Sequence, residues 1–168
     1  QLIANRKLES QYNLVYNQMF QSNKTVKGEA AKTLQDVVTD KNLPDLFTLL
    51  EQTDTDYVSA IQQAINASLS NLPADEQLNI VSDRMSKSNN KNLYYSALAN
   101  SESIKAMEEV INAYNTETGK NKQAALEALK QWKSLDGIYL LLDIARDSKD
   151  NNEIAQVVDA IVQKVTTS

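Results

Sequence analysis

Residues 43–69 read LPDLFTLLEQTDTDYVSAIQQAINASL and contain a complete pair of predicted helices. Pro44 lies in the first turn of the first helix, where the missing N–H of proline costs nothing. The polar stretch 53–56 then supplies capping oxygens for a second helix. Apolar residues recur at spacings of three and four through both segments, which predicts two amphipathic helices joined by a short turn.

The same pattern returns along the chain. Predicted pairs begin at Leu43, Leu72, Ser103 and Leu135, which are 29, 31 and 32 residues apart. Such a period is expected when each unit buries its apolar face only against its neighbours. Another pair precedes them, with helices at about 6–21 and 28–40 and an apolar stripe that includes Phe20. The predicted hairpins are approximately 6–40, 43–70, 74–99, 103–132 and 136–166.

The composition favours an all-α fold. The 168 residues include three glycines and two prolines, so long helices are unbroken and hairpin turns are scarce. A chain of this length buries a sizeable core without disulfides or metals. We therefore expect an α-α superhelix, a right-handed solenoid of about five helical hairpins, forming a single domain over residues 1–168.

Three segments carry a resemblance to a known repeat family. Residues 54–65 (DTDYVSAIQQAI) resemble the start of the second helix of HEAT repeats, and residues 122–129 and 152–161 resemble the same helix in later units. The resemblance covers roughly residues 28–165. Ser59 stands where the family often has an Arg that pairs with the turn Asp of neighbouring units. The repeats are therefore degenerate and lack the Asp–Arg ladder. The tetratricopeptide alternative expects a Trp-Leu-Gly-Tyr series and a late Pro, and the chain has neither.

The resemblance implies a binding face. In HEAT arrays the second helices usually line the concave side, so polar side chains on those helices are candidate contacts for a partner. The candidates on this face are Gln62, Gln63, Asn66, Tyr95, Lys130, Gln131 and Gln156.

Charge and hydropathy exclude several classes of partner. The net charge of −5 and the wide separation of the three arginines disfavour nucleic acid, because phosphate binding relies on clustered Lys and Arg. No apolar stretch approaches the roughly 18 residues of a membrane span. The first residue is Gln1, so we expect a piece of a larger protein. Its many Asn and Gln side chains favour an extracytoplasmic bacterial protein, periplasmic or secreted, and a monomer.

The residue types for catalysis are scarce. The chain has no His and no Cys, which removes the ordinary general base and thiol chemistry. Asp54 and Asp56 are predicted to cap a helix, and Asp147 and Asp150 to form a turn without the glycine of a calcium loop. The Ser86-Lys87 and Lys133-Ser134 neighbours lie at predicted helix ends. We therefore predict no catalytic, metal-binding or cofactor-binding residue.

The aromatic side chains offer a weaker signal for binding. Tyr94 and Tyr95 are adjacent on a predicted helix at about 91–99, so one of them is expected to be at least half exposed. Exposed aromatic rings favour partner binding or carbohydrate stacking. Trp132 lies on an apolar stripe and is predicted to be core.

Three functions follow from these observations. The first is a non-catalytic scaffold, a protein-interaction or spacer module that serves a protein partner or a companion domain. Bacterial HEAT-like arrays are often fused to enzymatic domains, including sugar-active ones, so the resemblance implies an accessory role beside such a domain. The second is a carbohydrate or small-ligand module that uses Tyr95 and the amides of the concave face. The third is an enzyme that uses Lys and carboxylates alone, which requires a deep pocket with convergent charges.

Overall fold

The computed structural model describes residues 2–166, with side chains from residue 10 onward. Within that range the chain forms ten α-helices and two short 3-10 helices, with no strand, which confirms the all-α prediction. The elements are α1 (Leu2–Gln18), α2 (Lys24–Val37), η1 (Asp40–Asn42), α3 (Leu43–Gln52), α4 (Thr55–Leu69), α5 (Ala74–Ser86), η2 (Lys91–Tyr94), α6 (Tyr95–Asn100), α7 (Ile104–Thr116), α8 (Gly119–Gln131), α9 (Leu135–Asp147) and α10 (Asn151–Thr166).

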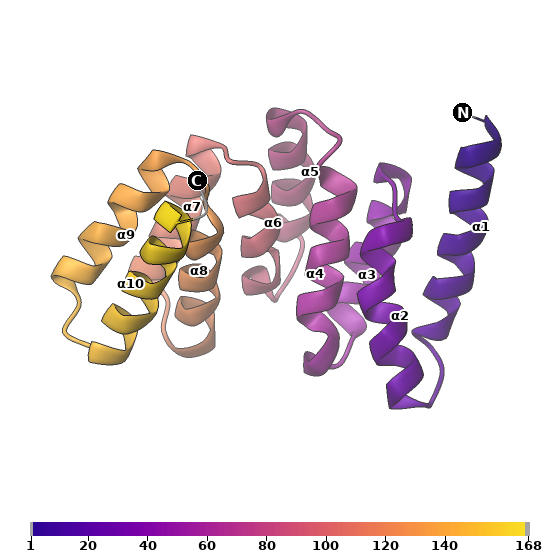
Figure 1. The fold of residues 1–168 in the computed structure, drawn as a ribbon, viewed down its shortest axis with the longest axis horizontal. Coiled ribbons are helices and arrows are strands. Elements are labelled where there is room, and N and C mark those ends of the chain that lie inside the picture. Colours follow the sequence, from indigo (N-terminus) through magenta and orange to yellow (C-terminus); the bar gives the residue numbers. More distant parts are fainter. Residues whose placement is uncertain (1, 167–168) are drawn as a thin grey trace.

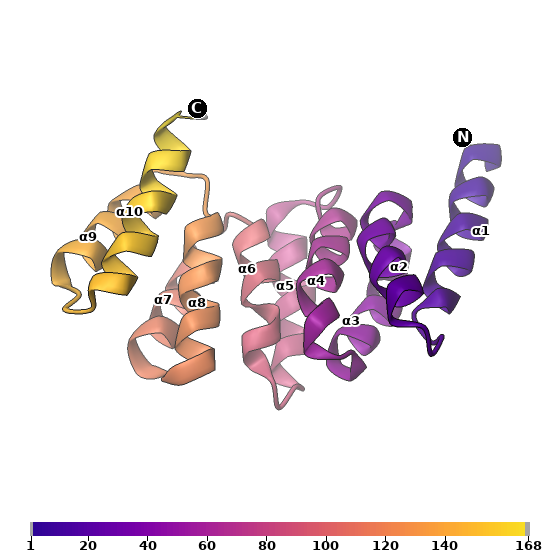
Figure 2. The ribbon, with the colours of Figure 1, turned by 60° about the horizontal axis from the view of Figure 1, so that its bottom comes forward.

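Consecutive helices pack as pairs. Helix α1 packs on α2, α3 on α4, α5 on α6, α7 on α8 and α9 on α10, and we call these pairs one to five. The even-numbered helices also pack on one another in the order α2, α4, α6, α8 and α10. We call this series the even row. The pairs follow one another along the long axis, so that α1 and the α9–α10 pair lie at opposite ends (Figures 1 and 2).

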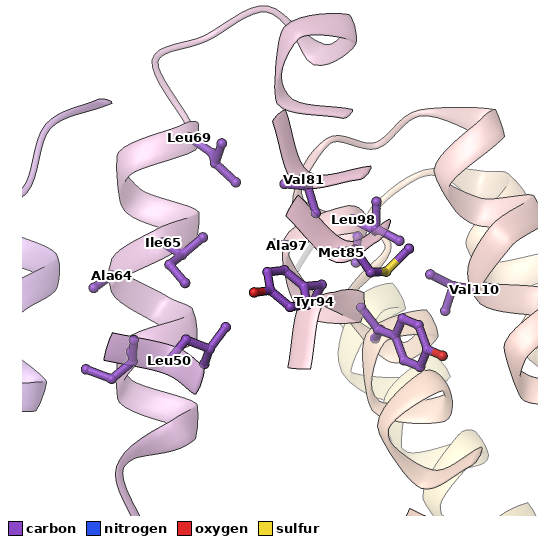
Figure 3. Close-up of a cluster of buried hydrophobic side chains, with 14 of the residues drawn as sticks. Leu50, Ala64, Ile65, Leu69, Val81, Met85, Tyr94, Ala97, Leu98 and Val110 are labelled. Atoms are coloured by element: carbon purple, nitrogen blue, oxygen red, sulfur yellow. The ribbon is translucent and has the colours of Figure 1, made fainter. Parts of the chain in front are cut away.

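A continuous apolar core runs between successive pairs. Figure 3 shows Ile65 and Leu69 of α4 pointing toward Val81 of α5 and the Tyr94 ring. All four side chains have 0% of their surface exposed. We call each contact between successive pairs a seam. Full burial of one such aliphatic side chain contributes about 1.5–3 kcal/mol, so the seam between pairs two and three is a main source of stability.

Several predicted helix starts are confirmed. Pro44 lies in the first turn of α3, and Pro73 is the N-cap of α5. Ser103 and Ser134 are the N-caps of α7 and α9, and the Ser134 hydroxyl accepts a hydrogen bond from the Gly137 N–H at 3.4 Å. Ser134 thus satisfies a free N–H group of the helix start, whereas the Ser103 side chain makes no capping hydrogen bond.

The predicted bounds of the first pair are wrong by about four residues. Helix α1 ends at Gln18, and Phe20 lies beyond it with 60% of its surface exposed. Helix α2 begins at Lys24 because the Asn23 side chain accepts hydrogen bonds from the N–H groups of Thr25 at 2.9 Å and Val26 at 3.2 Å. An asparagine cap thus starts the helix one turn before Gly28.

The expectation that Tyr94 or Tyr95 is half exposed is also wrong. Their exposed fractions are 0% and 4%. The predicted single helix is a 3-10 turn, η2, followed by α6, and the geometry changes between the two tyrosines. This short segment packs against α4, α5, α7 and α8, so neighbours surround it on several sides. The Tyr94 hydroxyl donates a hydrogen bond to the Glu51 carboxylate, which satisfies its buried polar atom.

The polar contacts between pairs repeat with the period of the sequence. Most of the side-chain hydrogen bonds between segments distant in sequence, to other side chains or to backbone carbonyls, join residues 29 to 35 positions apart. Tyr57 donates to the Lys24 carbonyl at 3.3 Å, and the Ser68 hydroxyl donates to the Thr39 carbonyl at 3.0 Å. Amides and hydroxyls therefore connect successive pairs.

The linker between pairs four and five is tightly packed. Trp132 is 1% exposed, which confirms its predicted core position. A Cβ added to Gly137 would lie 2.7 Å from the Trp132 Cβ, so only glycine fits there. The preceding linker holds Glu102, a non-glycine residue with a φ of 51°. Its carboxylate accepts hydrogen bonds from the backbone N–H of Lys133 at 2.9 Å and of Ser134 at 3.4 Å. These bonds offset a left-handed conformation that costs about 1 kcal/mol.

Candidate functional site

The predicted binding residues all lie on the even row. Three of them are on α4, Tyr95 begins α6, two are on α8 and one is on α10. Because these helices pack on one another in order, the row forms one surface across pairs two to five (Figure 2). The side chains on this surface fall into two groups, those that hold neighbouring helices together and those that face outward.

Gln62, Asn66 and Gln131 belong to the first group. The Gln62 amide donates to the Leu93 carbonyl at 2.8 Å. The Asn66 amide donates to the Ser96 hydroxyl at 3.1 Å, and that hydroxyl donates to the Gln131 Oε1 at 2.9 Å. Three helices, α4, α6 and α8, are linked by this chain of two hydrogen bonds. These residues are therefore part of the seam between pairs, which limits their freedom to contact a partner.

Tyr95 does not belong to an accessible face. Its ring is buried at the start of α6, where desolvation by burial and the nearby Glu117 and Glu109 carboxylates raise the pKa of its hydroxyl. The prediction that Tyr95 contributes to a binding face is contradicted by this burial. An aromatic ring with 4% of its surface exposed cannot stack on a sugar.

The remaining three candidates reach the surface. Gln63 is exposed on α4. Lys130 forms an ion pair of 2.7 Å with Glu127 one turn earlier on α8. Gln156 of α10 is half-buried, and its Oε1 accepts a hydrogen bond from the Gln123 amide at 3.2 Å.

Two hollows lie along the even row. The smaller, of about 330 Å³, is lined by residues of α4, η2, α6 and α8, including Gln62 and Gln131. The larger, of about 900 Å³, lies between α8, α9 and α10 and is lined by Lys130 and Gln156. Glu127 lines both, so the two hollows adjoin on α8. Four of the seven predicted residues thus line this pair of hollows, which we call the α8 groove.

The larger hollow contains Lys164, which the sequence did not single out, and Lys133, which was considered from the sequence only as the neighbour of Ser134. Lys133 and Lys164 line it together with Lys130 and with the acidic residues Glu127 and Asp159. The Lys164 ammonium donates to the Trp132 carbonyl. Burial and the nearby Lys133 charge lower the pKa of Lys164, while Glu102 acts in the opposite sense. The spacing of 32 residues between Trp132 and Lys164 equals one repeat, which is a signal that could have placed them together.

A second polar cluster lies at the opposite edge of pairs four and five. The Glu153 carboxylate forms an ion pair with Lys122 at 3.3 Å and accepts a hydrogen bond from the Ser148 hydroxyl. The Lys122 ammonium lies 4.5 Å from the centre of the Tyr114 ring. Burial alone would raise the pKa of Glu153, but hydrogen bonds from Ser148, Tyr114 and Lys122 outweigh it and lower that pKa.

The acidic residues of the predicted turns have local structural roles. The Asp150 carboxylate accepts hydrogen bonds from the N–H groups at the start of α10, that of Asn152 at 2.8 Å among them. Asp147 pairs with its neighbour Arg146. Asp54 occupies the N-cap position of α4, but its side chain makes no capping hydrogen bond, so the expected role of its carboxylate is not seen. Among residues 10–166 no group of three or more potential ligand side chains is arranged for a metal ion.

The Ser–Lys neighbours are placed at helix ends, as expected. The Lys87 ammonium pairs with Asp83 at 2.7 Å, and the Ser86 hydroxyl donates to the Asp83 carbonyl. Ser134 is engaged as the cap of α9. These contacts give both serines a local hydrogen-bonding role.

No family model, curated protein or solved structure matches the chain. In the part of the chain that the structure describes, no helix is both long enough and apolar enough to span a membrane.

Proposed function

We propose that the chain is a degenerate HEAT-like array, a right-handed α-α superhelix, that acts as a non-catalytic protein-interaction module. Two observations support the repeat architecture. Successive pairs share the same even-to-even packing, and the hydrogen bonds between pairs recur at 29 to 35 residues. Such arrays use an extended surface along one series of helices as a binding platform.

The α8 groove is the observation that carries the proposal. Its lining includes the exposed Gln131, whose Oε1 is used by Ser96, and the half-buried Gln156, beside the charges of Glu127 and Lys130. An extended peptide presents alternating N–H and C=O groups, and side-chain amides both donate and accept hydrogen bonds. A polypeptide segment of a protein partner or companion domain is therefore the occupant that this chemistry fits best.

The proposed function includes a compartment and a companion domain. In a bacterial protein that is periplasmic or secreted, the array would lie beside a sugar-active companion domain as a spacer or docking platform. The abundance of Asn and Gln supports the extracytoplasmic location. The groove gives that companion domain a defined surface to contact.

The two alternatives receive less support from the geometry. The carbohydrate hypothesis loses its aromatic platform, because Tyr95 is buried. The enzyme hypothesis needs an acid and a base that converge on a substrate. In the larger hollow the Glu127 carboxylate is instead paired with Lys130 at 2.7 Å. A peptide-binding role does not require a convergent acid and base, so it is compatible with this ion pair.

A selection from a random peptide library on the immobilised chain tests the proposal. Enriched peptides are then titrated by calorimetry against the wild-type chain and a charge-swap variant, Glu127→Lys with Lys130→Glu. We expect the swap to weaken binding at least about tenfold, because it reverses the groove charges in place. The matched control is Lys105→Glu with Glu108→Lys on α7, where both side chains are exposed outside the even row.

Failure to enrich any peptide would remove the proposed function. Equal losses in the two charge-swap variants would also count against the groove as the binding surface. A parallel titration with a panel of oligosaccharides separates the second candidate, which requires binding that the groove variants weaken.

A further inference from the structure

The seam between pairs four and five differs from the other seams of the array. Of the four contacts in the even row, that between α8 and α10 is the smallest, whereas α2 with α4 and α6 with α8 pack more extensively. Two hollows, of about 900 Å³ and about 610 Å³, lie within this seam, and every residue that lines them belongs to pair four, pair five or the linker between them. Protein interiors are close-packed, so a seam with two such hollows joins its two units over a small area.

The two pairs are firmly joined at one end of their helices, where the linker 132–134 connects α8 to α9. Trp132 is 1% exposed, and Gly137 of α9 packs directly on it. The Glu102 carboxylate accepts hydrogen bonds from two N–H groups of the linker. Lys164, near the end of α10, donates to the Trp132 carbonyl. Both helices of pair five are therefore held here, and we call this the linker end.

The opposite end of the seam is held by polar contacts. Here the α7–α8 turn and the α9–α10 turn lie at the lower ends of their pairs (Figure 1), beside the hollow of about 610 Å³. Lys122 of pair four forms an ion pair of 3.3 Å with Glu153 of pair five. Nearby, an exposed hydrogen bond of 3.2 Å joins Gln123 to Gln156. We call this the turn end, and the Lys122–Glu153 ion pair the latch.

The latch is a contact of charged groups with partial access to water. The Glu153 side chain is 14% exposed and that of Lys122 is 40% exposed. Burial opposes the ionised form of Glu153, while hydrogen bonds from Ser148 and Tyr114 favour it and lower its pKa. Because both charges regain hydration when such a pair separates, a partly buried ion pair gains little net free energy from being closed. A closed and an open turn end therefore lie close in free energy, unlike the two sides of an apolar seam.

We propose that pair five swings as a rigid unit about the linker end, and that the Lys122–Glu153 latch holds the turn end closed. Helices α9 and α10 pack extensively on each other, so they move together. Helix α10 has 16 residues and is about 24 Å long, so a swing of about 10° moves its turn end by about 4 Å. The larger hollow of the α8 groove lies between the same two pairs, so its shape changes with the swing. This hinge goes beyond the peptide-binding role and does not depend on it.

Distances between nitroxide spin labels, measured by pulsed electron paramagnetic resonance, test the proposal. The chain has no cysteine, so labels attach only at introduced positions. The turn-end pair is Lys120→Cys with Asn152→Cys, in the first turns of α8 and α10. The linker-end pair is Ile104→Cys with Leu135→Cys, the first residues of α7 and α9. A comparison pair across pairs three and four is Lys91→Cys with Lys120→Cys, and all five side chains are exposed.

Charge reversal at the latch is the decisive perturbation. Lys122→Glu places a second carboxylate beside Glu153, and we expect the turn-end distance to increase or spread by about 4 Å or more, as a swing of about 10° requires. The linker-end and comparison distances should stay unchanged. The swap of both charges, Lys122→Glu with Glu153→Lys, should restore the wild-type turn-end distance, because it rebuilds the ion pair.

A matched control reverses a charge in another ion pair. Lys87 pairs with Asp83 at 2.7 Å within α5, so Lys87→Glu should alter none of the three distances. Circular dichroism confirms that each variant is folded. Because these samples contain no peptide, their outcome is independent of the peptide selection that tests the α8 groove.

Three results would overturn the proposal. The first is a turn-end distance that Lys122→Glu leaves unchanged. The second is an equal change at the linker end, which would show that pair five separates from pair four without a pivot. The third is a double swap that keeps the altered distance, which would assign the change to disruption of the helices around the latch.

Discussion

Pairs two and five have the same sequence pattern and very different burial. Helix α4 in pair two buries six residues, among them Ile61, Ile65 and Leu69 at 0% exposure. Helix α10 in pair five carries six Ile and Val residues, yet only Val157 is fully buried. The difference lies in the neighbours, because α4 has helices on both sides in the even row and α10 on one. An apolar stripe therefore indicates which face of a helix is able to pack, while the position in the array decides whether it does.

The largest expected effect concerns the buried contact between pairs two and three. Ile65→Ala removes a fully buried side chain between pairs two and three, and we expect it to lower the free energy of unfolding by about 3–4 kcal/mol. Val162→Ala in α10, where the side chain is 54% exposed, should cost less than about 0.5 kcal/mol. Urea denaturation followed by circular dichroism measures both. Equal losses would show that the end pair is as tightly packed as the interior.

The second effect concerns the linker that attaches the end pair. Gly137→Ala places a Cβ 2.7 Å from that of Trp132, and the resulting overpacking should cost about 1–3 kcal/mol. Gly28→Ala is the matched control, because its nearest neighbour, a Tyr57 ring atom, would lie 3.9 Å away in an α2 helix. That substitution should stabilise the chain by about 0.5–1 kcal/mol. Thermal unfolding of the two variants should therefore shift in opposite directions, and a shift in the same direction would contradict the close contact.

The third effect tests the polar seam between the two linkers. Glu102→Ala removes both hydrogen bonds to the Lys133 and Ser134 N–H groups but retains the left-handed backbone. We expect a loss of about 1–2 kcal/mol. Glu102→Gly removes the same bonds and relieves the strain, so it should lose about 1 kcal/mol less than alanine. Chemical denaturation of both variants gives the difference, and an alanine variant as stable as the glycine variant would exclude the strain.

The smallest effect is the pH dependence of the seam between pairs four and five. The pKa of Glu153 is lowered in the folded chain, so its ionised form contributes stability above the unfolded pKa of about 4.3. That contribution is lost as the pH falls through the folded pKa. Glu153→Gln should remove roughly 0.5–1 kcal/mol near neutral pH and flatten the stability profile below about pH 4. Denaturation at several pH values measures this. A Glu153→Gln profile that is as steep in acid as the wild-type profile would place the dependence on other carboxylates.

Much of the fold could be predicted from local patterns. Pro44 and Pro73 mark helix starts by simple stereochemistry, and the spacing of apolar residues gives the helices that follow. The early start of α2 was missed because Asn23 caps the helix about one turn before Gly28, the predicted start. The burial of Tyr95 was missed because it depends on a change from 3-10 to α geometry and on four neighbouring helices.

The candidate site was harder to predict for a related reason. Membership of the even row follows from the repeat, so Lys130 and Gln156 could be placed there. Which amides hold the seam and which remain available depends on pairs of residues about 30 positions apart, such as Gln62 with Leu93. A single-helix pattern contains no information on those partners. Lys133 lies in a linker and Lys164 in the last turn of α10, outside the apolar stripes from which the helices were predicted, although the spacing of 32 residues between Trp132 and Lys164 matches the repeat.

The polar bonds at 29 to 35 residues also have a kinetic consequence. Each one joins neighbouring pairs and none spans the whole array, while the helices supply mostly local contacts, so the chain has a low contact order and should fold quickly. Folding can start at any interior seam and spread outward, and unfolding can begin at α9–α10 while the middle stays intact. Under a pulling force, such a chain would extend in steps, releasing one helix pair at a time. The array would then behave as an elastic tether whose stiffness is set by the weakest seam.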